Sequence, residues 1–405
     1  MSNYNFDRLA NRDNDYSKKW SKCFIEGRFG PVPDDYISMW IADMDYELAP
    51  PIYNHLENLL SKKTLAYIYP YEEFFKAIQY WMSFKTKNKV PLEEITLDYS
   101  IVNSLYHVVQ TFTKPGDRVL INTPVYNPFR EATKRNHAVL VENEMVINEE
   151  NRYVIDFEAL ERQMVEQHPK IYILCNPHNP GGTVWSREDL NKIAELCLKY
   201  NIILISDEAH SDHINQGTFT SALELDEKYR QNLVYLNSPN KAFNIAGLKT
   251  SYVIIPSHKL RTQYRETLEE CHVEEPNVFG AAALIAGYTP EGREWVESSF
   301  DYIIKNYEWA KAFMAKETPM LKVMPMDASY VMWVNVSQTG MDGDTFTRKL
   351  AQEEGILFQE GSSFGQGGED FVRINLGTSQ ELVQKAFNRM AKWLNEKNIQ
   401  EQEGE

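Results

Sequence analysis

Cysteine is scarce in this chain of 405 residues, which contains four. None of them belongs to a Cys-x-x-Cys pair or to a Cys/His cluster with the spacing of metal ligands. Cys175 and Cys197 lie in apolar runs, where we expect small core side chains. The pattern therefore predicts neither a disulfide framework nor a metal site, and it indicates a reducing compartment.

Long apolar runs and an excess of basic charge are also missing. No apolar run approaches the ~18 residues of a membrane span, and residues 1–15 lack the apolar centre of a secretory signal. Asp and Glu (58) outnumber Lys and Arg (42), which gives a formal net charge of −16. Nucleic acids and anionic membranes bind basic faces, so both are excluded as partners. We expect a cytoplasmic protein that acts on a small molecule.

Strands alternate with helices through the middle of the chain. The predicted strands are 118–122, 138–141, 170–175, 202–206 and 233–236. Helical stretches lie between them near 103–113, 127–136, 156–167 and 186–200, the last with Ser186 as its N-cap. This alternation predicts an α/β fold, a mostly parallel sheet covered by helices on both faces. The run 251–255 is expected to add an edge strand.

The pattern changes on both sides of this region. Residues 1–40 are polar with scattered aromatics and are expected to form an irregular arm. After Pro290 come a long helix, two strand-like runs and two further helices, which indicate a smaller α/β domain. We therefore expect three segments, which are an arm with part of the small domain (1–45), a large domain (46–288) and a small C-terminal domain (289–405).

Polar side chains follow the predicted strands where ligands of open parallel sheets bind, outside the carboxyl ends. They are Tyr126, Asn179, Asp207, Ser238 and Lys241. Each has an ordinary interpretation alone: a solvated lysine, a capping acid, a core tyrosine or a turn. Their joint placement on one edge favours a single site.

This set suits pyridoxal phosphate. That cofactor needs a lysine for a Schiff base and an acid against its pyridinium nitrogen. An aromatic side chain can stack on the ring, and an amide can bind its oxygen. The phosphate needs N–H groups at a helix N-terminus, and Ser100-Ile101-Val102-Asn103 precedes a predicted helix.

From about Phe6 to Trp393 the chain resembles the fold-type I pyridoxal-phosphate enzymes of the class I/II aminotransferase superfamily. More narrowly, it resembles their cystathionine β-lyase/cysteine-S-conjugate β-lyase (C–S lyase) subfamily. The motifs are Met39-Trp40-Ile41-Ala42-Asp43-Met44-Asp45, Asn176 to Gly181, Ser206-Asp207-Glu208-Ala209-His210, Lys241-Ala242-Phe243-Asn244 and Arg373-Ile374-Asn375. The first motif, together with Phe243 to Gly247, favours the lyases.

The resemblance implies roles for these residues. Lys241 would hold the cofactor covalently and move the Cα proton. Asp207 would pair with the ring nitrogen and Tyr126 would stack on the ring. Asn179 would bind the ring oxygen and, with Arg373, the substrate carboxylate.

The remaining implied roles concern the edges of the site. Backbone groups of Ile101 and Val102, with the Ser238 hydroxyl, would hold the phosphate. His210, a cofactor-binding residue, would lie near the ring oxygen and support Asp207. Tyr67 would reach the partner's phosphate in a homodimer. Pocket shape would depend on Trp40, as a substrate-binding residue, and on Tyr46, Tyr67, Tyr126 and the 361–368 loop.

Three positions depart from the family pattern. Ser100 stands where the phosphate loop often carries glycine, Ala66 precedes Tyr67 in place of glycine, and Lys249 replaces an arginine of many relatives. The resemblance also predicts cis peptide bonds at Thr123-Pro124 and Asn179-Pro180.

Three functions stay open at this stage. The first is α,β-elimination of sulfur amino acids to a thiol, pyruvate and ammonia. An aminotransferase would use the same residues. A regulatory protein that retains the fold is the third, although the ~40 residues before the first motif are too few and too acidic for a helix-turn-helix domain.

Overall fold

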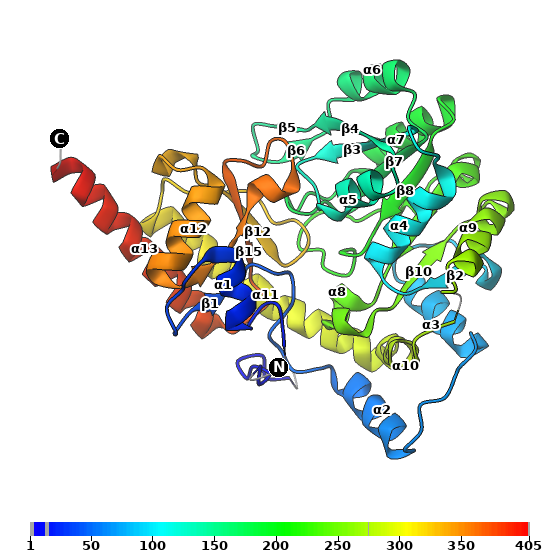
Figure 1. Cartoon of the computed structure of the whole chain (residues 1–405), viewed down its shortest axis with the longest axis horizontal. Helices are drawn as coiled ribbons and strands as arrows, with labels where there is room; N and C mark the ends of the chain where they lie inside the picture. The colour runs from blue at the N-terminus through cyan, green and yellow to red at the C-terminus, as the bar shows by residue number, and fades with distance from the viewer. Residues whose placement is uncertain (1–3, 13–15, 274, 404–405) are drawn as a thin grey trace.

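A seven-stranded sheet forms the centre of the larger part of the molecule (Figure 1). The computed structural model describes residues 4–12, 16–273 and 275–403. In spatial order the strands are β2 (Ile95–Asp98), β10 (Ser251–Ile254), β9 (Leu233–Asn237), β8 (Ile203–Asp207), β7 (Ile171–Cys175), β3 (Arg118–Thr123) and β4 (Val139–Glu144). The last five are parallel to one another, as predicted.

The prediction of an edge strand at 251–255 is wrong. Strand β10 is interior, because it pairs antiparallel with β9 on one side and with β2 on the other. The edge strand on this side is β2, which was not predicted because the polar residues Thr96 and Asp98 interrupt its apolar run.

Helices cover both faces of the sheet. Side chains alternate along each strand, so Val119 and Ile121 face one core and Leu120 faces the other. The first core is closed by α4 (Ile101–Phe112), α5 (Pro128–Arg135) and α9 (His258–Glu270). The second is closed by α3 (Glu72–Met82), α6 (Phe157–Gln167), α7 (Arg187–Lys199) and α10 (Val278–Gly287). The predicted three-layer αβα arrangement is confirmed.

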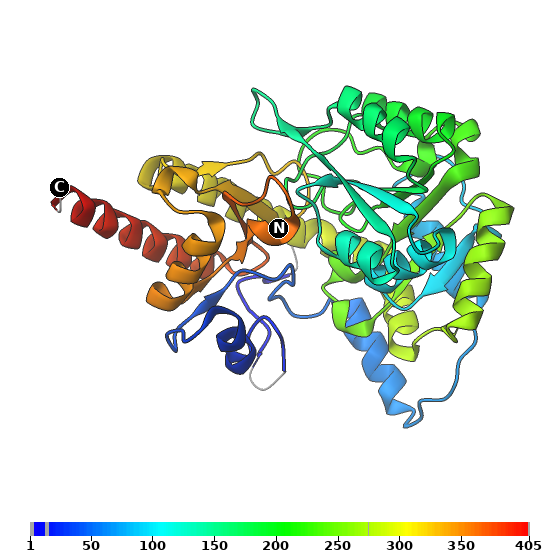
Figure 2. The same ribbon diagram turned by 45° about the horizontal axis from the view of Figure 1, so that its top comes forward.

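A smaller antiparallel sheet lies beside the large part (Figure 2). Its order is β11 (Lys322–Val323), β12 (Val331–Asn335), β15 (Phe371–Asn375) and β14 (Gln359–Glu360). It packs with α11 (Pro290–Glu317), α12 (Gly343–Glu354) and α13 (Gln380–Glu403). Helix α11 starts at a proline in its first turn, where the missing N–H costs no hydrogen bond.

The N-terminal segment is more regular than expected. It contains α1 (Lys22–Phe29) and β1 (Ile37–Ser38), and β1 pairs in parallel with β13 (Ile356–Leu357) of the C-terminal part. That pairing supports the grouping of residues 1–45 with the small domain, although the boundaries at 45 and 288 stay predictions. Residues 1–3, 13–15, 274 and 404–405 of the expected segments lie outside the described residues.

The remaining elements connect these layers. Helix α2 (Pro50–Ser61) lies at the periphery, as Figures 1 and 2 show, and a short helix α8 (Asn240–Phe243) follows β9. Strands β5 (Val146–Ile147) and β6 (Tyr153–Val154) form a separate hairpin. Ser186 caps α7, as predicted, by accepting a hydrogen bond from the Asp189 N–H.

Both predicted cis peptide bonds are present, and Asn176-Pro177 is a third that was not predicted. Among the described residues, no helix has the length and apolar character that a membrane crossing requires. No group of three or more His, Cys, Asp or Glu side chains in the same residues could hold a metal ion.

Candidate active site

Lys241 lies in the turn of α8 just after the buried strand β9. Its Nζ atom donates a hydrogen bond to the carbonyl oxygen of Ala42 at 2.8 Å. Burial, with the Arg373 charge next, lowers the pKa of Lys241 to about 8, against the opposing effect of Asp43 and Asp207. The neutral amine is therefore accessible near physiological pH, as a nucleophilic or basic lysine requires.

Asp207 ends β8 and is buried. Burial raises the pKa of its carboxyl group to about 7, although the Ala209 N–H, at 3.1 Å from Oδ1, and the Lys241 charge favour ionisation. A buried carboxylate is stable when a cation or an N–H donor faces it, so this position suits a protonated ring nitrogen.

A chain of hydrogen bonds connects Asn179, His210 and Ser329. The Asn179 amide nitrogen lies 3.4 Å from His210 Nε2, and His210 Nδ1 lies 2.9 Å from the Ser329 hydroxyl. Burial lowers the pKa of His210 well below its usual value, so the ring is neutral at pH 7. Since Asn179 donates to Nε2, Nδ1 carries the proton and donates to Ser329.

Arg373 projects from β15 and is buried. It donates to neutral oxygens only, which are Asn179 Oδ1 at 3.3 Å, the Trp40 carbonyl at 3.2 Å and Gln359 Oε1. Its Nε has no partner among the described residues. Burial lowers the pKa of the guanidinium to about 10, which still leaves it charged at pH 7. A buried cation without a carboxylate partner favours an anionic ligand.

Tyr126 follows β3 and joins these groups. Its backbone N–H donates to the Asn179 carbonyl at 3.2 Å. Burial, then the Asp207 charge, raises the pKa of Tyr126 to about 12 against the effect of Arg373, so the phenol is neutral. The structure thus brings together Lys241, Asp207, Asn179, Tyr126 and Arg373.

The N-terminus of α4 follows β2 at the same sheet edge as the end of β9, because neighbouring residues of β10, Ser251 and Tyr252, pair with Asp98 and Asn237. Ser100 caps it by accepting from the Asn103 N–H at 3.2 Å. Ile101 and Val102 are its first residues, and the first N–H groups of a helix have no partner within the helix.

The Ser238 hydroxyl is engaged within the chain. It donates to the Thr250 carbonyl at 2.9 Å and accepts from the Asn240 N–H at 3.1 Å. Ser238 must therefore rotate its hydroxyl proton to bind a phosphate. Lys249 is exposed in a left-handed conformation, with φ of 48°.

Three further predicted residues, Trp40, Tyr46 and Tyr67, are placed as follows. The Trp40 ring stacks on Phe24 and meets Phe29 edge-on, and the Trp40 carbonyl accepts a hydrogen bond from Arg373. Tyr46 is a core residue whose hydroxyl donates to the Thr378 carbonyl. Tyr67 is 96% exposed, between α2 and α3, and contributes nothing to the site of its own chain.

The Met39–Asp45 motif has a role that its sequence did not reveal. Asn375 donates to the carbonyls of Ile41 (2.6 Å) and Asp43 (2.8 Å). Asn244 donates to the Met44 carbonyl at 2.7 Å. The intervening carbonyl of Ala42 faces Lys241. Both asparagines belong to motifs noted in the sequence, but the acceptor is backbone and carries no residue-type signal.

Tyr330 and Gln359 are further residues of the site that were missed. Tyr330 donates to the Ala42 carbonyl at 3.0 Å, and Gln359 accepts from Arg373. In the predicted 361–368 loop, Phe364 packs under Arg373, whose guanidinium carbon lies 4.9 Å from the ring centroid. The Phe364 carbonyl accepts from the Val125 N–H at 2.8 Å, which fixes this loop to the large part of the molecule.

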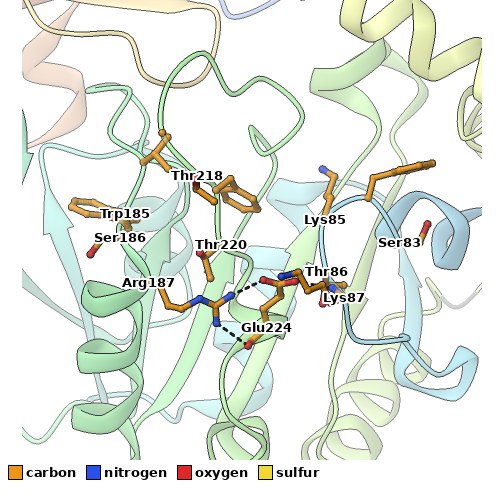
Figure 3. A pocket seen from close by; sticks show the side chains of 14 residues that line it. Ser83, Lys85, Thr86, Lys87, Trp185, Ser186, Arg187, Thr218, Thr220 and Glu224 are labelled. Carbon is orange, nitrogen blue, oxygen red and sulfur yellow. Dashed lines mark hydrogen bonds and ion pairs between the residues drawn. The ribbon is translucent and has the colours of Figure 1, made fainter.

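A surface pocket of about 690 Å³ lies apart from this site (Figure 3). Two of its cations are already paired. Arg187 pairs with Glu224 at 2.7 Å, as Figure 3 shows, and Lys85 pairs with Asp212 at 2.8 Å. None of the predicted site residues lines it. The pocket therefore has no part in the chemistry predicted from the strand ends.

Known proteins share this architecture. Cystathionine beta-lyase PatB of Bacillus subtilis (strain 168) is 35% identical to the chain, over 95% of the chain and 98% of the relative. Cystalysin from Treponema denticola, whose crystal structure contains pyridoxal 5'-phosphate, is 30% identical with a TM-score of 0.92, over 97% of this chain and 99% of that one. The PLP-bound C-S lyase from Staphylococcus hominis is 27% identical with a TM-score of 0.86, over 96% and 99%.

The family model of class I and II aminotransferases matches residues 42–390. That range includes the lysine, the aspartate and the arginine described above, and the fold predicted from the sequence is the fold of the similar structures. The chain therefore belongs to the class I and II aminotransferase family.

Proposed function

We propose that this protein is a pyridoxal-phosphate-dependent carbon–sulfur lyase. It catalyses α,β-elimination of a sulfur amino acid such as cystathionine or a cysteine S-conjugate, and with water releases a thiol, pyruvate and ammonia. The observation that carries the proposal is the grouping of Lys241 and Asp207, at one edge of the large sheet, with Arg373 of β15, which donates only to neutral partners. Similarity to a cystathionine beta-lyase over nearly the whole chain supports it.

The residues present fit the cofactor. When bound, pyridoxal phosphate supplies an aldehyde for amines and a ring that accepts electrons from Cα. Lys241 is the amine that would attach to it, and Asp207 would face the ring nitrogen. Tyr126 would lie on the ring, and Asn179, steadied by His210, would face the ring oxygen.

The phosphate would occupy the N-terminus of α4. Free N–H groups of Ile101 and Val102 and the positive end of the helix dipole suit an anion there. The Ser238 hydroxyl would contribute after rotating away from Thr250.

Arg373 would bind the substrate α-carboxylate. Its guanidinium is held in place by three oxygens and has no competing carboxylate among the described residues. The Asn179 amide would donate a second hydrogen bond to this carboxylate. Its partner His210 is neutral, so the His210 ring does not compete with Arg373 for the carboxylate.

Lys241 would move the Cα proton as general base. With a pKa of about 8 it is neutral in a substantial fraction at pH 7 to 8, which suits proton transfer. The Ala42 carbonyl would hold the amine once it is free of the cofactor.

Replacement of Lys241 tests this assignment. In Lys241→Ala we expect loss of the absorbance of the bound cofactor and a fall in turnover of at least about 1000-fold. Lys392→Ala, which changes an exposed lysine of α13, is the control and should behave as the wild type. A Lys241→Ala protein that releases pyruvate at the wild-type rate would refute the assignment.

An aminotransferase is the alternative, because the family model includes that activity. Both reactions begin with removal of the Cα proton, so the same residues serve both. Release of thiol and pyruvate without a 2-oxo acid acceptor supports the lyase, and consumption of an acceptor supports the transaminase.

A homodimer is also part of the proposal. Tyr67 (96% exposed) and Tyr69 (75%) lie with exposed Leu60 and Leu65 around the end of α2, an apolar surface that a second copy could cover. Tyr67 would then reach the partner's phosphate. Sedimentation of the purified protein tests this: a monomer at micromolar concentration would contradict it. The cytoplasmic location stays a prediction, which cell fractionation tests.

A further inference from the structure

Gln359 and Arg373 face each other across strands β14 and β15. They are direct partners in the antiparallel register, so their side chains lie on the same face of the small sheet. Gln359 Oε1 accepts from Arg373 Nη2, and Gln359 Nε2 donates to the Ser363 hydroxyl at 3.2 Å. Because Ser363 takes the NH₂ end of the amide, the carbonyl end faces the guanidinium.

The next residue, Glu360, carries the charge that Gln359 lacks. It pairs with Val372 in the register, and its side chain therefore projects from the opposite face of the strand. There it forms an ion pair with Arg28 of α1. A shift of β14 by one residue would place this carboxylate beside Arg373.

This arrangement keeps Arg373 free of any carboxylate partner among the described residues. Its other two acceptors, Asn179 Oδ1 and the Trp40 carbonyl, are also neutral. A fixed carboxylate at position 359 would neutralise the guanidinium and repel a second carboxylate, whereas a neutral amide orients the guanidinium and leaves its charge available.

We propose that Gln359 is a positioning residue that sets the affinity of Arg373 for the α-carboxylate of the substrate. The inference deepens the proposed function, since it rests on carboxylate binding by Arg373. Because the Gln359 amide is neutral, the site selects substrates that carry a free α-carboxylate.

Two ligands that differ in one group test the proposal. These are 3-(ethylthio)propionate, which has the carboxylate and no amine, and 2-(ethylthio)ethylamine, which has the amine and no carboxylate. Their binding to the holoenzyme is measured by calorimetry for the wild type, Gln359→Glu, Gln359→Ala and Glu360→Gln. Glu360→Gln is the matched control, because it removes a charge that acts on Arg373 from the opposite face, without a hydrogen bond to the guanidinium.

For the acid, we expect the dissociation constant to rise about 100-fold in Gln359→Glu, where two carboxylates compete. In Gln359→Ala it rises about 10-fold, because one hydrogen bond to a charged group is lost. In Glu360→Gln it changes less than about threefold. The dissociation constant of the amine is the same for all four proteins. The KM for S-ethyl-cysteine rises in the same variants, and by the same factors, as the dissociation constant of the acid, while kcat changes less than about threefold.

Two results would overturn the proposal: equal affinity of Gln359→Glu and wild type for the acid, or equal weakening of acid and amine, which indicates a merely structural role. A wild type that does not bind the acid would overturn it as well. If the wild type binds the acid and Gln359→Glu does not, while S-ethyl-cysteine yields no pyruvate, the role of Gln359 stands and the lyase proposal fails.

Discussion

The Nζ atom of Lys241 and the carbonyl oxygen of Ala42 are 2.8 Å apart, although 199 positions separate them in the chain. The hydroxyl of Tyr330 donates to the same oxygen at 3.0 Å. One backbone acceptor is therefore shared by an amine and a phenol. Since a hydrogen bond to the ammonium form favours that form, Tyr330 competes with protonation of Lys241.

Replacement of Tyr330 by Phe is expected to raise the pKa of Lys241 in the apoprotein above its value of about 8. The Ala42 carbonyl then bonds to the ammonium alone, and a rise of about half a unit is expected. The measurement is the pH dependence of Lys241 acetylation, followed by mass spectrometry. Tyr252→Phe, which changes a hydroxyl that contacts Tyr288 at 3.3 Å in the core, is the control. A lowered pKa in Tyr330→Phe would contradict this role.

Asp207 makes the stability of the apoprotein depend on pH. Its pKa is raised from 3.8 to about 7, so between these values the folded chain keeps a proton that the unfolded chain has lost. Stability from this group is fully present below about pH 4 and is lost as the pH rises to about 7.

The free energy of unfolding of the wild type, minus that of Asp207→Asn, should therefore fall by about 4 kcal/mol between pH 4 and 7. Urea denaturation of both apoproteins across this range measures it. Glu208, whose pKa is also raised to about 7 by burial, is present in both proteins and cancels in the difference. A difference that stays flat or rises would show that Asp207 is ionised in the folded apoprotein.

Replacement of Arg373 by Lys should raise the KM for an amino acid substrate about 100-fold, with a smaller change in kcat. One ammonium cannot contact Asn179, Gln359 and a carboxylate in the fork geometry of a guanidinium. Steady-state kinetics with S-ethyl-cysteine measure the two constants. Arg389→Lys, which alters a partly exposed pair with Asp35, is the matched control. An unchanged KM in Arg373→Lys would place the carboxylate elsewhere.

Mixed dimers test the reach of Tyr67 across the proposed dimer interface. Co-expression of Lys241→Ala and Tyr67→Ala subunits should restore about a quarter of the wild-type activity. Half of randomly formed dimers are mixed, and each of these has one site with both Lys241 and the partner's Tyr67. Each variant alone should be far less active. Mixtures no more active than the separate variants would place Tyr67 outside the partner's site.

The residues at the strand ends could be predicted from sequence, and the residues that hold them in place could not. Asp207 and Lys241 each follow a short buried strand, and the rule for parallel sheets brings such positions together. The Ala42 carbonyl has no residue-type signal, because every residue has one. Gln359 is a neutral amide in a two-residue strand, and only its register with Arg373 shows its function.

The sequence pattern did not show which elements pack against one another. A run such as Ser251–Ile254 shows that a strand exists but not which strands flank it, and the flanking strand β2 was not predicted. Trp40 belongs to a family motif, but its ring packs against Phe29 of α1, a helix that was not predicted. The sequence pattern predicts whether a segment is a helix or a strand, whereas tertiary packing decides which elements lie next to it.

Incubation of the purified protein with cystathionine, without any 2-oxo acid, tests the proposed reaction most directly. Thiol, pyruvate and ammonia are quantified together for the wild type and for Lys241→Ala. Lyase chemistry predicts equal amounts of the three products from the wild type and none from the variant. Turnover that requires a 2-oxo acid, with its amino product formed and no thiol released, would contradict the proposal and identify a transaminase.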